Sequence, residues 1–118
     1  AKDNSNNNSI VFKLSHNNTT ILFTGDIEEK VEESLVDFYC PTNAGNCSVL
    51  KSTILKSAHH GSDTSSIKNF LQAVDPLKTI ISVGKNKFGH PSLRVLRRLQ
   101  RQGIKILRTD ITGDIIIK

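Results

Sequence analysis

Short apolar, strand-like segments alternate with amphipathic helical segments along most of this 118-residue chain. That order favours an α/β fold, in which helices pack against a β-sheet. A chain of this length buries roughly two thirds of its unfolded surface, which is enough for one core. The predicted strands cover residues 10–15, 19–24, 49–55, 79–83, 104–107 and 114–117, and the predicted helices cover 28–38, 67–74 and a segment that opens at 90–92 and ends before Gly103.

Polar segments mark the start of the chain and two of its turns. Residues 1–9 are rich in Asn and Ser and lack periodicity, so we interpret them as a linker or frayed start and residues 10–118 as the folded part. Residues 16–18 predict a hairpin turn, and residues 110–113 predict a turn before the last strand. In the third helix we expect Leu93, Leu96 and Leu99 to form the buried stripe.

The sequence lacks the usual signals of membrane insertion and secretion. A membrane-spanning helix needs about 18 apolar residues in a row, and no such run is present. No apolar segment near the first residue indicates a signal peptide. The chain starts at Ala1 and contains no Met, so we interpret it as a fragment with limited activity of its own.

Charge is distributed unevenly along the chain. Residues 1–63 contain 5 Lys and Arg against 8 Asp and Glu, a net charge of −3, whereas residues 64–118 contain 11 against 3, a net charge of +8. The basic half favours a polyanionic partner. A solvated basic surface without a partner explains the same pattern, so charge alone does not decide between the two.

Cys40 and Cys47 enclose a short loop that contains the turn-forming residues Pro41, Asn43 and Gly45. Such a loop can bring the two sulfur atoms together. A disulfide would indicate an oxidising compartment, and two free thiols are equally consistent with the sequence. A zinc knuckle is not expected, because no second Cys/His pair with ligand spacing follows.

Titratable side chains follow directly after three of the predicted strands. They are Asp26, the adjacent His59 and His60, and His90. Layered α/β folds gather ligand-binding residues at strand ends. Carboxylates and imidazoles bind divalent metals, and imidazole also transfers protons near neutral pH. These positions therefore predict a metal-binding or catalytic site, whereas His16, in a polar turn, has no predicted role.

Each of these residues also has a simpler structural interpretation that the sequence leaves open. Asp26 is equally well placed to cap the helix near Glu28, and His90 is consistent with a capping or surface residue. His59 and His60 are neighbours, so on an extended backbone their side chains point to opposite sides. We expect one of them to enter the site and the other to pack against it or orient it.

The third helix carries a row of arginines. Arg94, Arg98 and Arg101 are spaced to share one face, opposite the leucines, and Lys85 and Lys87 lie just upstream. Guanidinium groups match phosphate oxygens, so this face is a candidate phosphate-binding surface. A solvated helix face is an equally good interpretation.

Five short motifs, taken in order, resemble one known family. Over roughly residues 8–118, the chain resembles the C-terminal half of the metallo-β-lactamase-like domain of ComEC-type competence proteins. The resemblance implies half of an αββα sandwich, whose two sheets enclose a hydrolytic site with two divalent metal ions, Zn or Mn. The motifs are Thr24-Gly25-Asp26, Ala58-His59-His60-Gly61-Ser62, Ile81-Ser82-Val83-Gly84-Lys85-Asn86, Gly89-His90-Pro91-Ser92 and Arg108-Thr109-Asp110.

The resemblance also implies roles for individual residues. Asp26 matches a carboxylate that bridges the metals, and His60 is favoured over His59 as the metal ligand. His59 and His90 are then candidate catalytic residues, with His90 at the rim as a substrate contact or proton donor. The candidate substrate-binding residues are Ser62, Lys85, Arg94, Arg98 and Arg101, which would contact the DNA backbone without reading its sequence.

The implied activity is two-metal hydrolysis of phosphodiesters, which degrades one DNA strand during uptake. The implied partners are DNA and the rest of a larger membrane protein, including the other half of the domain. The implied location is the outer face of the cytoplasmic membrane, where a Cys40–Cys47 disulfide is permitted.

The chain departs from the family in one large respect. The His-x-His-x-Asp-His motif, which supplies most metal ligands in the family, is absent from the sequence. We therefore expect this chain alone to bind metal weakly and to be inactive. Two alternatives from other classes remain: a stand-alone metallo-hydrolase of a small phosphoester, and a non-catalytic binding module that keeps the fold.

Overall fold

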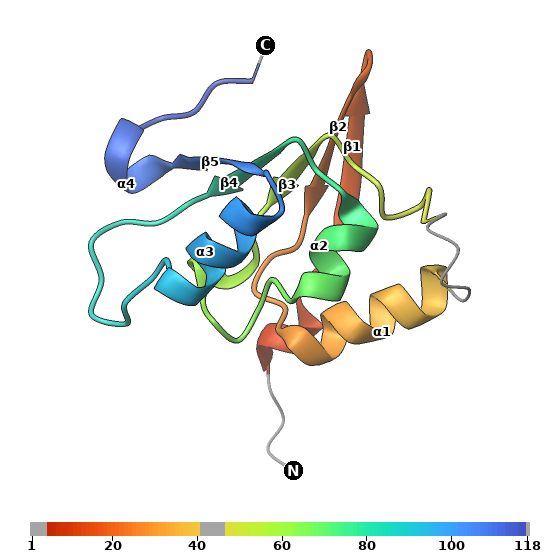
Figure 1. The fold of residues 1–118 in the computed structure, drawn as a ribbon, viewed down its shortest axis with the longest axis horizontal. Helices are drawn as coiled ribbons and strands as arrows, with labels where there is room; N and C mark the ends of the chain where they lie inside the picture. Colours follow the sequence, from red (N-terminus) through yellow and green to blue (C-terminus); the bar gives the residue numbers. More distant parts are fainter. Residues whose placement is uncertain (1–4, 41–46, 118) are drawn as a thin grey trace.

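The computed structural model describes residues 5–40 and 47–117 and confirms the predicted α/β class (Figure 1). Its five-stranded sheet has the order β1-β2-β3-β4-β5. The first two strands form an antiparallel hairpin, and every later pair of neighbours is parallel. The elements are η1 (Ser5–Asn8), β1 (Phe12–His16), β2 (Thr19–Phe23), α1 (Glu29–Tyr39), β3 (Ile54–Lys56), η2 (Ala58–Gly61), α2 (Lys68–Val74), β4 (Lys78–Ile81), α3 (Leu93–Arg101), β5 (Lys105–Arg108) and α4 (Thr109–Thr112).

Helices α1, α2 and α3 cover one face of the sheet. Each lies in the crossover between two parallel strands, and each new strand joins the same edge of the sheet. Because such crossovers are right-handed, successive crossovers in one direction place their helices on one side, as Figure 1 shows. The core between these helices and the sheet includes Leu22, Leu55, Phe70, Leu71, Val74, Ile81, Val95 and Leu99.

The opposite face of the sheet is apolar and largely open. Phe12 and Leu14 on β1 are about half exposed, at 51% and 52%. Phe12 stacks on Phe23 of β2 with ring centroids 4.7 Å apart. This face has two shallow hollows, of about 280 and 410 Å³, and both Ile21 and Ile117 line each of them. The C-terminal segment therefore lies over part of this face and leaves the rest uncovered.

The strand predicted at residues 49–55 is mostly wrong, because only Ile54–Lys56 (β3) is extended. The preceding residues form a turn, in which Leu50 N donates to Cys47 O at 3.0 Å and Ser52 Oγ donates to Leu50 O at 3.1 Å. Local bonds of this kind compete with sheet pairing. Leu50 is buried whereas Val49 is 53% exposed, so the apolar run marks a packed turn.

The last predicted strand is also wrong, since residues 114–117 are described and form no strand. The predicted turn before it is the short helix α4. Thr112 Oγ1 donates to Arg108 O at 3.0 Å, and Gly113 N donates to Thr109 O at 2.9 Å. These local bonds close a helical turn, after which Gly113 adopts a positive φ of 72° and redirects the chain.

The buried face of α3 differs from the predicted apolar stripe, and α1 buries an acid while exposing an aromatic residue. On α3, Val95 and Leu99 are fully buried, whereas Leu93 is 60% exposed. On α1, Phe38 is 75% exposed, whereas Glu32 is buried. Sequence spacing identified both helices, but the neighbouring elements decide which side chains are covered.

Cys40 and Cys47 are joined by a disulfide, which decides between the two alternatives that the sequence left open. The loop residues 41–46 lie outside the described residues, as do residues 1–4 of the expected linker. Among the helices that the structure describes, none has the length and apolar character needed to cross a bilayer.

Candidate functional site

The predicted site residues lie at one edge of the sheet. Strands β2 to β5 run parallel, so the segments that follow them meet at the same edge. Asp26 follows β2, His59 and His60 follow β3, and His90 lies in the loop between β4 and α3. The structure brings these four side chains into one cluster, which we call the histidine cluster.

His60 and Asp26 form the centre of the histidine cluster. His60 Nε2 lies 3.9 Å from Asp26 Oδ1, and both side chains are about half exposed. His60 Nδ1 donates to the carbonyl oxygen of Ser82 at 2.6 Å. A carbonyl only accepts, so Nδ1 carries the proton and the lone pair of the neutral ring is on Nε2, toward Asp26. Metal-ligating histidines are commonly held in this way, through a bond from the second ring nitrogen.

The backbone of the two adjacent histidines is left-handed, not extended as predicted. His59 has φ 52° and His60 has φ 53°. His59 N donates to Gly25 O at 2.9 Å, which ties this turn to the segment after β2. Both side chains therefore enter the histidine cluster instead of pointing to opposite sides of a strand. Left-handed backbone is costly for residues other than Gly, so contacts such as this one must hold the turn in place.

Within the histidine cluster, His59 lies next to His90. His59 Nδ1 lies 3.6 Å from Glu28 Oε2 and 3.5 Å from Thr64 Oγ1. The rings of His59 and His90 have centroids 5.6 Å apart. Burial, together with the nearby His59 and His60, lowers the pKa of His90. His90 is therefore neutral at neutral pH, and its ring can accept a proton.

The start of the chain holds the turn that carries Asp26. Ser9 Oγ accepts a hydrogen bond from Asp26 N at 3.1 Å, and Asn7 Oδ1 accepts one from Glu28 N at 3.0 Å. Gly25 has φ +56°, and a Cβ atom there would lie 2.7 Å from Ser9 Cβ. Asn7 and Ser9 were predicted to lie in a linker or frayed start, because polar composition alone gives no signal of these contacts.

A buried carboxylate, Glu32, holds the segment that follows the histidines. Its Oε2 accepts from Ser66 N at 2.7 Å, and its Oε1 accepts from Ile67 N at 3.0 Å, at the start of α2. Arg98 Nη1 donates to Ser66 O at 2.7 Å. Burial raises the pKa of Glu32 to about 7, although the two backbone donors and Arg98 act in the opposite direction. Arg98 is thus bonded within the fold and is not free on the helix face.

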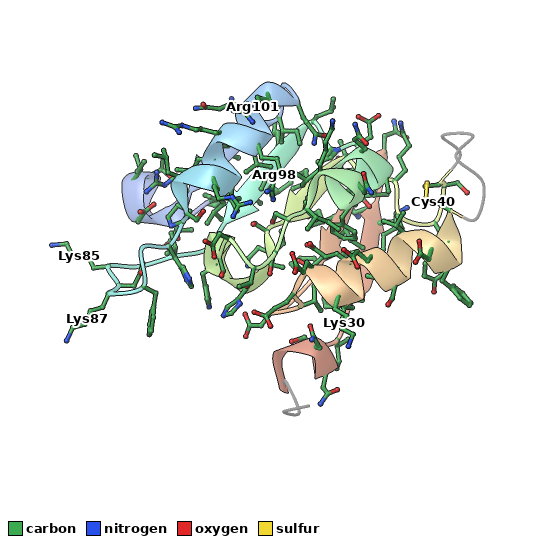
Figure 2. The ribbon with its side chains drawn as sticks, turned by 60° about the horizontal axis from the view of Figure 1, so that its bottom comes forward. Lys30, Cys40, Lys85, Lys87, Arg98 and Arg101 are labelled. Carbon is green, nitrogen blue, oxygen red and sulfur yellow. A yellow bond between two sulfur atoms is a disulfide. The ribbon has the colours of Figure 1, made fainter. Side chains whose placement is uncertain are left out.

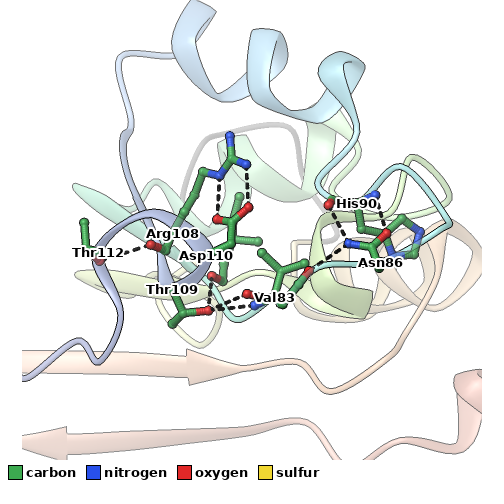
Figure 3. Close-up of polar contacts among 9 residues, drawn as sticks. Val83, Asn86, His90, Arg108, Thr109, Asp110 and Thr112 are labelled. Atoms are coloured by element: carbon green, nitrogen blue, oxygen red, sulfur yellow. Dashed lines mark hydrogen bonds and ion pairs between the residues drawn. The ribbon is translucent and has the colours of Figure 1, made fainter.

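The loop before α3 is anchored at the end of β5. Thr109 Oγ1 accepts from Val83 N at 2.8 Å and donates to Val83 O at 2.9 Å (Figure 3). Beside it, Arg108 makes two bonds to the Asp110 carboxylate, at 3.0 and 2.7 Å. The bonds from Arg108 lower the pKa of Asp110. These contacts fix where the β4–α3 loop leaves the sheet.

The predicted substrate-binding residues lie in different environments. Ser62 is buried, and its hydroxyl lies 2.9 Å from that of Thr64. Arg94 and Arg101 are exposed on α3, and Lys85 is exposed on the β4–α3 loop. Figure 2 shows Lys85 and Arg101 well separated. The structure therefore does not gather these residues into one compact basic patch.

Two charged residues near the site were overlooked at the level of sequence. Glu28 was predicted only to begin the first helix, although it lies two residues after Asp26 and contacts His59. Lys56 ends β3, and burial lowers its pKa while Asp26 raises it. A lysine that interrupts an apolar run just before two histidines is the sequence signal that could have identified it.

Several known proteins contain a segment similar to this chain. The chain is 42% identical to Competence protein ComA of Neisseria gonorrhoeae over 109 residues, or 92% of this chain. It is 37% identical to ComE operon protein 3 of Bacillus subtilis over 111 residues, or 93% of this chain. The chain is homologous to part of the ComEC-type competence proteins. It is also 32% identical to the Uncharacterized protein YcaI of Escherichia coli over 115 residues. This ComEC-type segment spans 13–15% of the length of these relatives, and no family model matches it.

The residues of this ComEC-type segment fit part of a metal site. Asp26 and His60 supply the carboxylate and imidazole donors that Zn and Mn accept. Within residues 5–40 and 47–117, no three His, Cys, Asp or Glu side chains come close enough together to hold an ion by themselves. The anchored His60 ring and the facing Asp26 carboxylate therefore fit two positions of a ligand set, not all of it.

Proposed function

We propose that this chain is the C-terminal half of a metal-dependent phosphodiesterase domain that degrades one strand of DNA during uptake. The observation that carries the proposal is the His60 ring, anchored through Nδ1 to Ser82 O and facing Asp26 through Nε2. Two of the relatives are named Competence protein ComA and ComE operon protein 3, and these names support a role in DNA uptake. The homology to ComEC-type proteins supports a hydrolytic domain of the metallo-β-lactamase type.

Asp26 and His60 would hold the divalent metal. A bound metal of this type lowers the pKa of a water molecule and stabilises charge on phosphate oxygens. His90, whose lowered pKa keeps its ring neutral at neutral pH, would accept or return a proton at the rim of the histidine cluster. His59, between Glu28 and His90, would orient the His90 ring and move protons away from it.

The open face of the sheet would receive the other half of the domain. Two sheets of a sandwich pack through apolar faces, and Phe12, Leu14, Phe23 and Ile80 supply such a face here. The chain spans 13–15% of the length of its relatives, so they contain ample sequence for a second sheet. In this proposal that second sheet also brings the remaining metal ligands.

The proposed location is outside the cytoplasm, within a larger membrane protein. Disulfides persist in oxidising compartments, so the Cys40–Cys47 bond supports this side of the membrane. The small share of the relatives that the chain spans supports a larger parent protein.

The test compares variants of the complete protein by metal content and by cleavage of an end-labelled oligonucleotide. We expect Asp26→Asn and His60→Gln each to reduce bound metal and to slow cleavage by at least about 100-fold, because each removes a ligand. His16→Gln is the matched control, since His16 is exposed at the end of β1, away from the sheet edge that carries the cluster. It should leave both measurements unchanged.

Several outcomes would contradict or revise the proposal. Unchanged metal content and cleavage in Asp26→Asn would contradict it. Loss of metal in His59→Gln but not in His60→Gln would exchange the roles of the two histidines. DNA binding without cleavage at any metal concentration would indicate a binding module, and cleavage of a small phosphodiester but not of DNA would indicate the small-molecule hydrolase.

A further inference from the structure

The loop between β4 and α3 carries an exposed phenylalanine beside the histidine cluster. Phe88 is 81% exposed, and the exposed Lys85 and Lys87 precede it. Figure 2 shows both lysines on a loop that projects from the body of the molecule. Single exposed apolar residues are ordinary on protein surfaces, so exposure alone does not indicate a site.

The loop has a fixed shape because one side chain bonds to its backbone at four places. Asn86 Nδ2 donates to the carbonyl oxygens of Gly84 and His90, at 3.0 and 2.8 Å. Asn86 Oδ1 accepts from the backbone N–H groups of Phe88 and His90, both at 3.0 Å. Figure 3 shows Asn86 and His90 joined in this way. Phe88 is therefore held out to solvent by an ordered loop.

Phe88 also lines a pocket that reaches the histidine cluster. The pocket has a volume of about 220 Å³, and its walls include His60, His90, Lys85 and Asn86. The rings of Phe88 and His90 have centroids 5.7 Å apart and are tilted by 33°. Pockets for drug-sized ligands begin at about 300 Å³, so this volume suits one planar group.

We propose that Phe88 stacks on one base of a single-stranded nucleic acid, while Lys85 and Lys87 contact the adjoining phosphates. An aromatic ring, nearby cations and a groove beside the backbone are the elements of single-strand binding. In a duplex the base faces are already stacked on their neighbours, so this contact favours unpaired strands. The inference rests on the proposed function and identifies its substrate as a single strand entering beside His60 and His90.

Phe38 is a second exposed phenylalanine, but its surroundings differ from those of Phe88. Phe38 on α1 is similarly exposed, at 75%, but its ring packs edge-on against Tyr39, and its neighbour in sequence is the acidic Asp37. It lines none of the three pockets described here. Phe38 therefore serves as the matched control.

The experiment measures binding of labelled oligonucleotides to the complete protein carrying Asp26→Asn, which is expected to bind without cleaving. The probes are a single strand of 12 nucleotides, the same strand with abasic positions, and a closed hairpin duplex. Phe88→Ala should weaken single-strand binding about 5- to 150-fold, the range for loss of one stacked base. Phe88→Trp should retain affinity, and Phe38→Ala should not change it.

The abasic strands isolate the stacking contact from any effect on folding. When the base that contacts Phe88 is missing, Phe88→Ala should cause no further loss, and hairpin binding should change less than twofold throughout. Equal affinity of Phe88→Ala and its parent for the intact strand, or no single-strand binding by the parent, would overturn the inference. If the protein with Asp26 intact fails to cleave DNA but Phe88 dependence persists, only the proposed function fails.

Discussion

Glu32 is the residue through which α1, α2 and α3 meet behind the histidine cluster. Its carboxylate accepts the two backbone N–H groups at the start of α2, and Arg98 bonds to the carbonyl of Ser66 in the same segment. Few sequence rules would place an acid in the interior, since acids are rarely buried unless they are paired. The stability of this region should therefore depend on pH.

We predict that this region becomes less stable as pH rises from about 4.5 to about 7. The pKa of Glu32 is raised from 4.5 to about 7, so in this range the folded state binds more protons than the unfolded state. Stability then falls with pH, by up to about 3 kcal/mol. The measurement is hydrogen exchange at the Ser66 and Ile67 amides of the complete protein, corrected for intrinsic rates. Glu32→Gln should flatten this dependence, whereas Glu33→Gln, exposed on the same helix, should preserve it.

Residue types were predictable at the site, but backbone conformations were not. Asp26 and His60 were singled out because they follow strands, and strand ends can be recognised from a run of apolar residues. The left-handed turn at His59 and His60 has no such signal, because it depends on the bond from His59 N to Gly25 O. Helical spacing likewise gives no sign of the hydrogen bond from Arg98 to Ser66 O, because that bond depends on a contact between distant segments.

At the scale of elements, the turn after β3 and the loop before α3 are in close contact at Gly61. Gly61 has φ +80°, and a Cβ atom there would lie 2.6 Å from Pro91 Cβ and 3.0 Å from Pro91 Cα. Gly61 O also accepts a hydrogen bond from Ser92 N at 2.9 Å. The turn after β3 and the loop before α3 can approach this closely only because residue 61 has no side chain.

We predict that Gly61→Ala separates the two turns and slows DNA cleavage by the complete protein at least about tenfold, because His60 and His90 then move apart. Gly103→Ala is the control, since Gly103 also has a positive φ, +71°, but no atom lies within 4 Å of its Cβ position. Both variants should lose roughly 1–2 kcal/mol from backbone strain. Equal cleavage by the two variants would show that the close approach does not matter.

Periodicity predicted the elements with long regular patterns and failed where short local bonds compete. The helices α1 and α2 and the hairpin of β1 and β2 follow the predicted ranges closely. At Leu50 and at Thr112, by contrast, an apolar or β-branched run lies beside side chains that bond to nearby backbone, and turns form instead. The sequence pattern shows which residues are apolar, but it does not show where local hydrogen bonds will form in place of sheet pairing.

At the scale of the whole molecule, the positive charge of residues 64–118 is spread over separate surfaces. The β4–α3 loop carries Lys85 and Lys87, and α3 carries the exposed Arg94 and Arg101. The proposed stacking on Phe88 would bring a nucleic acid strand to the loop. The salt dependence of binding can therefore distinguish the two surfaces.

We predict that changing Lys85 and Lys87 to Gln reduces the slope of log affinity against log salt concentration by about 1.4 for a single strand, at about 0.7 per lost phosphate contact. Changing Arg94 and Arg101 to Gln tests α3 in the same assay, and a similar reduction would extend the path of the strand along that helix. An unchanged slope for the lysine pair would mean that the loop does not contact phosphates. All four residues are exposed, so the fold should tolerate the changes.

The hydrogen bond from His60 Nδ1 to Ser82 O determines which sequence changes this site tolerates during evolution. The acceptor is the main-chain carbonyl of Ser82, so every amino acid at position 82 supplies the same oxygen. Point substitutions there leave the ring orientation intact, whereas an insertion or deletion between β4 and Gly84 would shift the carbonyl away. Selection at this position should therefore act on segment length more than on residue identity, and relatives can diverge at Ser82 without losing the histidine's alignment.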